Sequence, residues 1–170
     1  MEQVLTFEQG PIRPPSESGS LLIRVTRNCP WNRCTFCATY KGKRFSFRTI
    51  EEIKADIDAV RVIADALKRE SWRLGLGGKV TSEVLRLLIR RHPESYNAEG
   101  ERTDLAARRL DSLANVAGWL SSGSKTVFLQ DANSPQMTAA DMAEVLTYLK
   151  KTFDGIERIT SYARSKTVAR

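Results

Sequence analysis

The chain has 170 residues, of which 41% are hydrophobic and 28% are charged, and its formal net charge is +7. These values are typical of one globular domain. The sequence has no run of about 18 apolar residues, so no membrane-spanning helix and no membrane partner are expected. The acidic N-terminus lacks the basic and apolar regions of a signal peptide, so a cytoplasmic location is predicted.

The first segment is irregular. Residues 1–19 contain five Pro and Gly residues and are expected to form a lead-in to a β/α domain over residues 20–170. The apolar, β-branched run Leu21–Thr26 then predicts a buried strand, and Pro30 prevents its continuation. All three cysteines follow directly after this strand.

Two amphipathic helices are predicted from capping residues and apolar spacing. Thr49, with Glu52 three residues later, has the pattern of a capping box. The apolar residues from there to Leu67 recur at helical spacing, so one face of this helix should pack on a sheet. A second such helix is expected between Thr138, as its cap, and the Asp-Gly pair that ends at Gly155.

A helical hairpin is expected as an insertion over about residues 71–121. It begins with a flexible connection at 71–79, followed by a short amphipathic helix over Ser82–Arg91. A polar loop is predicted over 94–102, and Thr103 is expected to cap a longer helix. The insertion separates the first strand and helix from the rest of the β/α pattern.

That pattern resumes with two more strands, Thr126–Gln130 and Ile156–Tyr162. Strands separated by helices predict a parallel sheet with right-handed crossovers. Ligands bind such sheets at the carboxyl ends of the strands. The cysteine segment, the turn 130–133 and the turn 161–164 should therefore converge on one face.

The chemistry of the site is indicated by Cys29, Cys34 and Cys37, the only cysteines in the chain. In a reducing compartment this spacing favours a metal over a disulfide. A structural zinc ion needs a fourth ligand, and the only histidine, His92, lies some 55 positions beyond Cys37. Buried, unligated cysteines would not suit a polar, basic loop. An iron–sulfur cluster with one open iron fits three thiolates best.

The cysteines lie in a basic stretch. Its positive field favours thiolates, and it would attract an anionic substrate or a phosphate backbone. The alternative is a solvated basic loop that offsets the thiolate charge. The stretch holds seven basic residues and no acidic one: Arg24, Arg27, Arg33, Lys41, Lys43, Arg44 and Arg48.

A strand that runs into a cysteine triad, with Phe36 just before the last cysteine and a long helix after it, resembles the radical S-adenosylmethionine superfamily. The segments 10–15 and 23–34 look like a bacterial subgroup loosely labelled as related to oxygen-independent coproporphyrinogen III oxidase. The superfamily's usual spacing is three residues, then two, whereas here it is four, then two. The longer first half still lets each thiolate reach a different iron.

The resemblance implies a 4Fe–4S cluster on Cys29, Cys34 and Cys37, whose open iron binds the methionine amino and carboxylate groups of S-adenosylmethionine. One electron from the cluster would cleave this cofactor to methionine and a 5′-deoxyadenosyl radical, which takes a hydrogen atom from a substrate that the sequence does not identify. It thus implies an enzyme of oxidoreductase or transferase type, with a reductant such as flavodoxin or ferredoxin.

Six further residues are implied as cofactor contacts: Phe36, Gln130, Asp131, Asn133, Ser161 and Arg164. Phe36 would lie against the adenine, and its alternative is a core aromatic. The strand-end Gln130 or Asp131 would accept a hydrogen bond from the ammonium group, where the family has a Gly-Gly-Glu-like motif. The alternative is a strand-end turn in which Asp131 and Asn133 bond their own backbone. Arg164 would pair with the cofactor carboxylate or else lie on the surface at a helix start.

The family's core usually has six β-α units, and three strands are predicted here. The expected fold is therefore a partial (β/α) barrel of α/β class, with helices on its outer face. Residues 164–170 look like the start of another helix, so we expect an N-terminal half with weak or no activity by itself. The alternative function is a small zinc- or iron-binding module that binds nucleic acid through its basic face.

Overall fold

The computed structural model describes residues 6–96 and 104–169. Its centre is a three-stranded parallel sheet of β1 (Leu21–Arg24), β4 (Thr126–Gln130) and β5 (Arg158–Ser161), in the order β1-β4-β5. Leu22 pairs with Phe128, which in turn pairs with Thr160. The predicted α/β class with three parallel strands is confirmed.

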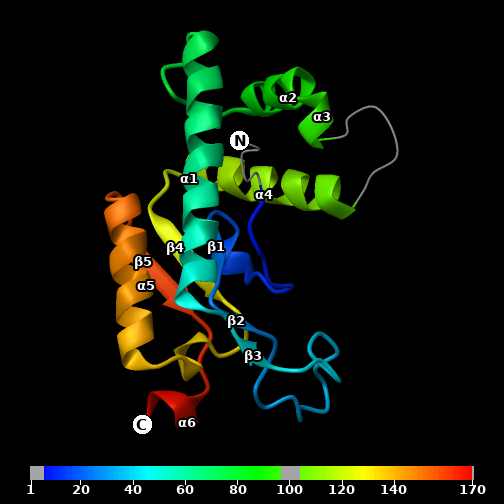
Figure 1. The fold of residues 1–170 in the computed structure, drawn as a ribbon, viewed down its shortest axis with the longest axis vertical. Coiled ribbons are helices and arrows are strands. Elements are labelled where there is room, and N and C mark those ends of the chain that lie inside the picture. The colour runs from blue at the N-terminus through cyan, green and yellow to red at the C-terminus, as the bar shows by residue number, and fades with distance from the viewer. Residues whose placement is uncertain (1–5, 97–103, 170) are drawn as a thin grey trace.

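Two helices, α1 (Ile50–Arg73) and α5 (Ala139–Thr152), lie side by side against one face of the sheet (Figure 1). The predicted capping box at Thr49 is present, and Thr138 caps α5. Alternate strand residues such as Ile23 and Leu129 belong to the core that these helices cover. Full burial stabilises each such side chain by roughly 1.5–3 kcal/mol.

The opposite face of the sheet meets the N-terminal lead-in, which contains the short 3-10 turn η1 (Pro15–Glu17). Because side chains alternate along a strand, Gln130 points away from the face that Leu129 occupies. The Gln130 side chain bonds the backbone of Gly10 and Ile12, and Glu17 pairs with Arg158. These bonds attach the lead-in to β4 and β5.

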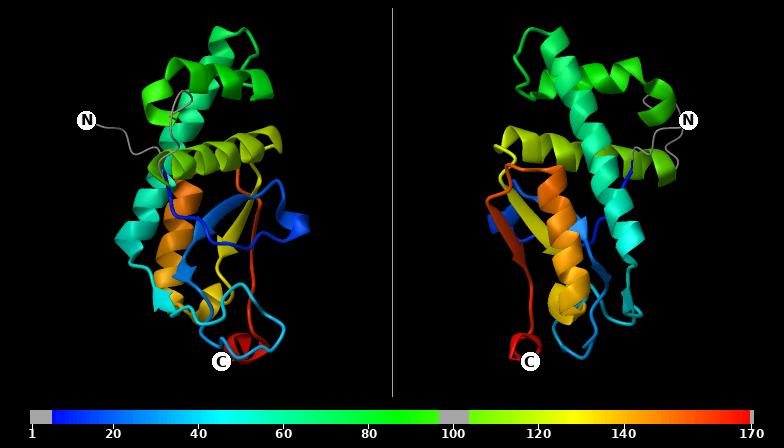
Figure 2. Two further views of the ribbon diagram at one scale, coloured as in Figure 1. Left: turned by 90° about the vertical axis from the view of Figure 1, so that its right-hand side faces the viewer. Right: turned by 60° about the vertical axis from the view of Figure 1, so that its left-hand side comes forward.

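The insertion forms α2 (Ser82–Arg91), α3 (Pro93–Tyr96) and α4 (Asp104–Ser121). Helix α4 lies along the β1 side of the sheet, where Asn115 Oδ1 accepts a hydrogen bond from the Leu22 N–H at 3.3 Å. Helices α2 and α3 pack near the far end of α1 (Figure 2).

Two boundaries in this region differ from the prediction. Helix α1 continues to Arg73, so the connection begins later than residue 71. The predicted loop is wrong at 94–96, because Pro93 can start a helix and the Tyr96 N–H bonds the His92 carbonyl at 3.2 Å. The rest of that loop and the Thr103 cap lie outside the described residues.

A second, two-stranded sheet was not predicted. Its strands β2 (Thr26–Arg27) and β3 (Ser46–Phe47) are antiparallel and join the two ends of the cysteine segment. The third parallel strand is shorter than predicted, and the helix after it, α6, spans Ser165–Val168. In the described parts of the chain, no helix combines the length and apolar character needed to cross a membrane.

Candidate functional site

The three cysteines lie on one loop, residues 28–45, at the carboxyl ends of the parallel strands (Figures 1 and 2). We call it the cysteine loop. Asn28 and Asn32 have positive φ angles of 66° and 47°, a conformation that asparagine tolerates better than most residues. Their side-chain amides donate to the Arg44 carbonyl at 2.7 Å and the Lys43 carbonyl at 2.9 Å. The two asparagines therefore brace the outgoing arm of the loop against the returning arm.

Cys29, Cys34 and Cys37 are free and partly exposed. The Asn32 N–H lies 3.5 Å from Cys29 Sγ, as a donor to sulfur. Within residues 6–96 and 104–169, no three His, Cys, Asp or Glu side chains are close enough to share one metal ion. An iron–sulfur cluster does not require that proximity, since each thiolate binds a different iron. The donor set, three accessible thiols on one loop, fits such a cluster.

Asp131, at the end of β4, holds the base of the cysteine loop. Its buried carboxylate accepts from Arg24 Nε at 2.9 Å and from the Asn28 N–H at 2.8 Å. Its other oxygen accepts from the Tyr40 hydroxyl at 2.8 Å. Burial and then this hydrogen bond raise the pKa of Tyr40, so its hydroxyl remains a donor. Asp131 thus joins β1 and both arms of the loop.

The neighbouring residue Gln130 has a comparable structural role, because its side chain holds the lead-in. The peptide bond between Gln130 and Asp131 is cis. The Gln130 amide oxygen accepts from the Gly10 N–H at 2.8 Å, and its nitrogen donates to the Ile12 carbonyl at 2.6 Å. Gly10 approaches so closely that a Cβ there would lie 2.2 Å from Asp131 Oδ1. The lead-in therefore packs directly on the turn, where only glycine fits.

Charged side chains extend this support beneath the loop. Burial alone would raise the pKa of Glu8, but the hydrogen bond from Arg27 and the charges of Arg48 and Arg24 outweigh it and lower that pKa. Glu8 belongs to a set of charged side chains that we call the loop-base network: Glu8, Arg24, Arg27, Arg48, Glu52, Asp56 and Asp131. Each of these side chains forms an ion pair with another member of the network, at distances between 2.5 and 3.5 Å.

The end of β5 also reaches the cysteine loop. Asn133 Oδ1 accepts from the Arg164 N–H at 3.0 Å, and its amide donates to Thr167 at 3.0 Å. The Arg164 guanidinium lies over the Trp31 ring at 4.2 Å from the centroid. Ser161 only bonds locally, to the Tyr162 carbonyl. The three strand-end segments therefore meet, as their order along the sheet predicts.

The predicted cofactor contacts fall into two groups. Gln130 and Asp131 are buried and bonded to other segments of the chain. The alternative, a turn in which Asp131 and Asn133 bond their own backbone, is wrong for Asp131, whose partners are Arg24, Asn28 and Tyr40. Phe36 is 89% exposed, so the alternative of a core aromatic is also wrong. Asn133 is buried as well, whereas Phe36, Ser161 and Arg164 have a surface open to a ligand.

Several supporting residues were missed by the sequence reasoning. Glu8 and Gly10 lie in the lead-in, which was treated as irregular, and Tyr40 has no motif around it. Trp31 was the one with a signal: an aromatic ring within a basic loop.

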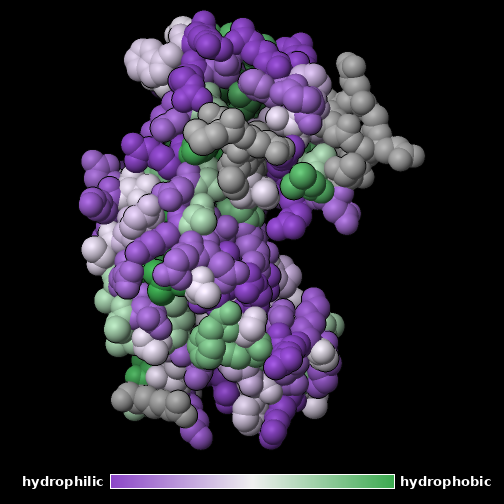
Figure 3. Space-filling model, viewed as in Figure 1, coloured by the Kyte–Doolittle hydropathy of each residue, from purple (hydrophilic) through white to green (hydrophobic). Residues whose placement is uncertain are grey.

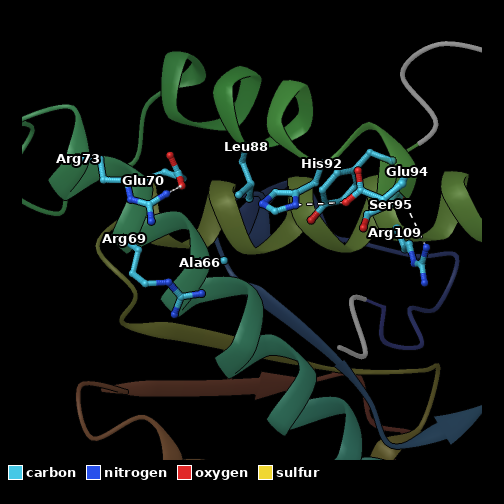
Figure 4. A pocket seen from close by; sticks show the side chains of 10 residues that line it. Ala66, Arg69, Glu70, Arg73, Leu88, His92, Glu94, Ser95 and Arg109 are labelled. Carbon is cyan, nitrogen blue, oxygen red and sulfur yellow. Dashed lines mark hydrogen bonds and ion pairs between the residues drawn. The ribbon is translucent and has the colours of Figure 1, made fainter. Parts of the chain in front are cut away.

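A separate cavity of about 650 Å³ lies at the other end of the molecule, among α1, α2, α3 and α4 (Figure 4). Glu70 is buried there between Arg73 and Arg91, and His92 bonds Glu94. The carboxylates of Glu70 and Glu94 that line the cavity are therefore paired with basic side chains. None of the predicted site residues lines it.

No protein-family model, curated protein or solved structure matches the chain. The function therefore has to be inferred from the residues and their arrangement.

Proposed function

We propose that the protein is an iron–sulfur enzyme of the radical S-adenosylmethionine type, with an unidentified substrate. The observation that carries the proposal is the convergence at the cysteine loop. The loop that bears all three thiols is held by Asp131 from the end of β4, and Arg164 from the end of β5 stacks on it. Ligand sites of parallel sheets lie at such strand ends.

Cys29, Cys34 and Cys37 would hold the cluster, which when bound supplies the electron that cleaves S-adenosylmethionine. The chain's own contribution is positioning and charge. The cations of the loop would offset the negative charge of the cluster and its thiolates. Phe36 would offer an apolar surface to the adenine, and the Arg164 guanidinium, which lies over Trp31, would pair with the methionine carboxylate.

The roles of Gln130, Asp131 and Asn133 in this proposal are indirect. Their polar atoms already bond the lead-in, the loop-base network and α6. In this arrangement they position the loop and the Arg164 backbone, and a direct contact with the cofactor would require these bonds to be exchanged. Ser161, partly exposed beside Tyr162, retains its proposed place at the rim of the site.

The sheet is proposed to be part of a (β/α) barrel. Its helices α1 and α5 cover one face, as the outer helices of a barrel do. In the described residues β5 has a hydrogen-bonded neighbour on one side only, so further strands could pair with its other edge. We further propose a cytoplasmic protein that receives electrons from a flavodoxin- or ferredoxin-type donor.

The proposal is tested by anaerobic reconstitution with iron and sulfide, followed by iron analysis. The unaltered chain should retain about four iron atoms. Cys34→Ala should lose this iron, because one of the three thiolates is removed. Thr35→Ala, an exposed neighbour in the same loop, is the matched control and should retain it. Full iron content in Cys34→Ala would exclude this loop as the ligand set.

A further inference from the structure

The face around the cysteine loop carries cations that no carboxylate neutralises. We call it the loop-end face, formed by residues 28–47 and 162–169, which contain no Asp or Glu. None of its six exposed or half-exposed cations forms an ion pair within the described residues: Arg33, Lys41, Lys43, Arg44, Arg164 and Lys166. Unopposed charge of one sign attracts a polyanion.

Large aromatic side chains of the same residue ranges are exposed to solvent. Phe36 is 89% exposed, Phe47 55% and Trp31 43%. Exposing such rings to water is costly, so a group of them marks a contact surface. In Figure 3 the lower end of the molecule, where this face lies, is mostly hydrophilic with hydrophobic atoms among the charges.

At Trp31, the aromatic ring and two cations of the face are in direct contact. The Arg164 and Arg33 guanidinium groups lie 4.2 and 5.3 Å from the centroid of the Trp31 ring. Aromatic rings and guanidinium planes are the surfaces on which unpaired bases stack, while cations next to them bind the phosphates. A duplex hides the faces of its bases, so it would leave these rings without a stacking partner.

We propose that the loop-end face binds single-stranded RNA, with its bases on Trp31, Phe36 and Phe47 and its phosphates on the surrounding cations. We favour RNA because the loops and ends of RNA molecules regularly expose unstacked bases. The inference does not rest on the proposed function, since it needs no cluster and would stand if reconstitution failed.

The stacking part is tested with a fluorescein-labelled oligouridylate of about twelve nucleotides, followed by fluorescence anisotropy. Phe36→Ala should raise the dissociation constant roughly tenfold, the loss expected for one stacked base. Trp72→Ala is the matched control, because Trp72 is 67% exposed at the far end of α1. It should change the constant less than about twofold. Equal effects of the two substitutions would overturn the proposal.

The charge part is tested by repeating the titration at increasing salt. Lys43→Ala with Arg44→Ala removes two cations from the face, and Lys150→Ala with Lys151→Ala removes two exposed cations from α5. Only the first pair should flatten the slope of log affinity against log salt, by about 1.4, since a single strand gives roughly 0.7 per phosphate contact. Equal slopes for both pairs would contradict a phosphate-binding face.

Competing occupants are separated in the same assay. RNA should bind more tightly than a duplex of the same length and should resist polyglutamate at equal charge. Equal binding of the duplex, or equally effective displacement by polyglutamate, would overturn the proposal in favour of a plain polyanion or an acidic protein. Tighter binding of single-stranded DNA would overturn the assignment to RNA.

Discussion

The loop-base network and the loop-end face lie next to each other, and their charged side chains differ in whether they form ion pairs. In the network every charged side chain has an opposite partner, and Arg48 and Asp131 are buried. On the face, six cations, four from the cysteine loop and two from residues 162–169, have no carboxylate partner in the described chain.

The difference separates two roles. Buried ion pairs hold a geometry, because losing one partner leaves the other charged and desolvated. Unpaired surface cations add little to stability and remain available to a ligand. Substitutions in the network should therefore change stability, and substitutions on the face should change binding with little effect on stability.

The largest expected effect is that of Asp131→Ala, which removes the acceptor of Arg24, Asn28 and Tyr40. We expect the free energy of unfolding to fall by roughly 3–5 kcal/mol, as for a broken buried ion pair. Chemical denaturation measures this. Asp154→Ala, at an exposed position, should change it by less than about 0.5 kcal/mol. Similar losses in both variants would remove the distinction between network and surface.

Gly10→Ala tests the contact between the lead-in and the turn. The new Cβ would meet Asp131 Oδ1 at 2.2 Å and Gln130 Cβ at 3.3 Å, so the carboxylate must leave its partners. We expect a loss of about 1–3 kcal/mol, as for overpacking. Gly118→Ala is the control, since its Cβ meets nothing within 4 Å and it lies in α4. It should stabilise the protein by roughly 0.5–1 kcal/mol. Thermal unfolding of the two variants measures both changes, and equal stability of Gly10→Ala and Gly118→Ala would contradict the close contact at Gly10.

Glu8 makes the loop-base network sensitive to acid. Its pKa is lowered in the folded protein from an ordinary value of 4.5, so its stabilising contribution is complete above that pH. The contribution is lost as the pH falls below 4.5 and through the lowered pKa. Glu8→Gln should therefore make the free energy of unfolding depend less steeply on pH as the pH falls below 4.5. An unchanged slope, measured by denaturation across this range, would show that Glu8 does not carry the acid sensitivity.

The smallest effects are expected for the two arginines over Trp31, beginning with Arg164→Ala. The guanidinium over Trp31 is half-exposed, and a cation–π contact at such a site contributes about 0.5–1 kcal/mol. Arg33→Ala, which removes a longer contact at 5.3 Å, should cost less. The two variants are ranked by urea denaturation followed through tryptophan fluorescence. A larger loss for Arg33→Ala would mean that the β5 end does not fasten the loop.

Signals carried by neighbouring residues were enough to predict most of the fold. Thr49 and Glu52 lie three positions apart and form their capping box within one turn, and the apolar run around Phe128 and Leu129 is local. The ribbon of β2 and β3 was missed because strands of two residues have no readable period.

The site was predictable only in its position. The convergence of the strand ends follows from the β-α order alone. The partners of Asp131 do not, because Arg24, Asn28 and Tyr40 lie between 91 and 107 positions away from it along the chain. The contact of Gly10 with the turn likewise depends on a lead-in of no regular structure, which carries no periodic signal.

The central claim, a cluster on the cysteine loop that binds S-adenosylmethionine, is tested most directly by electron paramagnetic resonance of the reconstituted, reduced protein. We predict a four-iron signal that changes when S-adenosylmethionine is added, because the three thiolates of Cys29, Cys34 and Cys37 leave one iron open. Tight stoichiometric zinc with no iron signal, or a four-iron signal that S-adenosylmethionine leaves unchanged, would contradict the account.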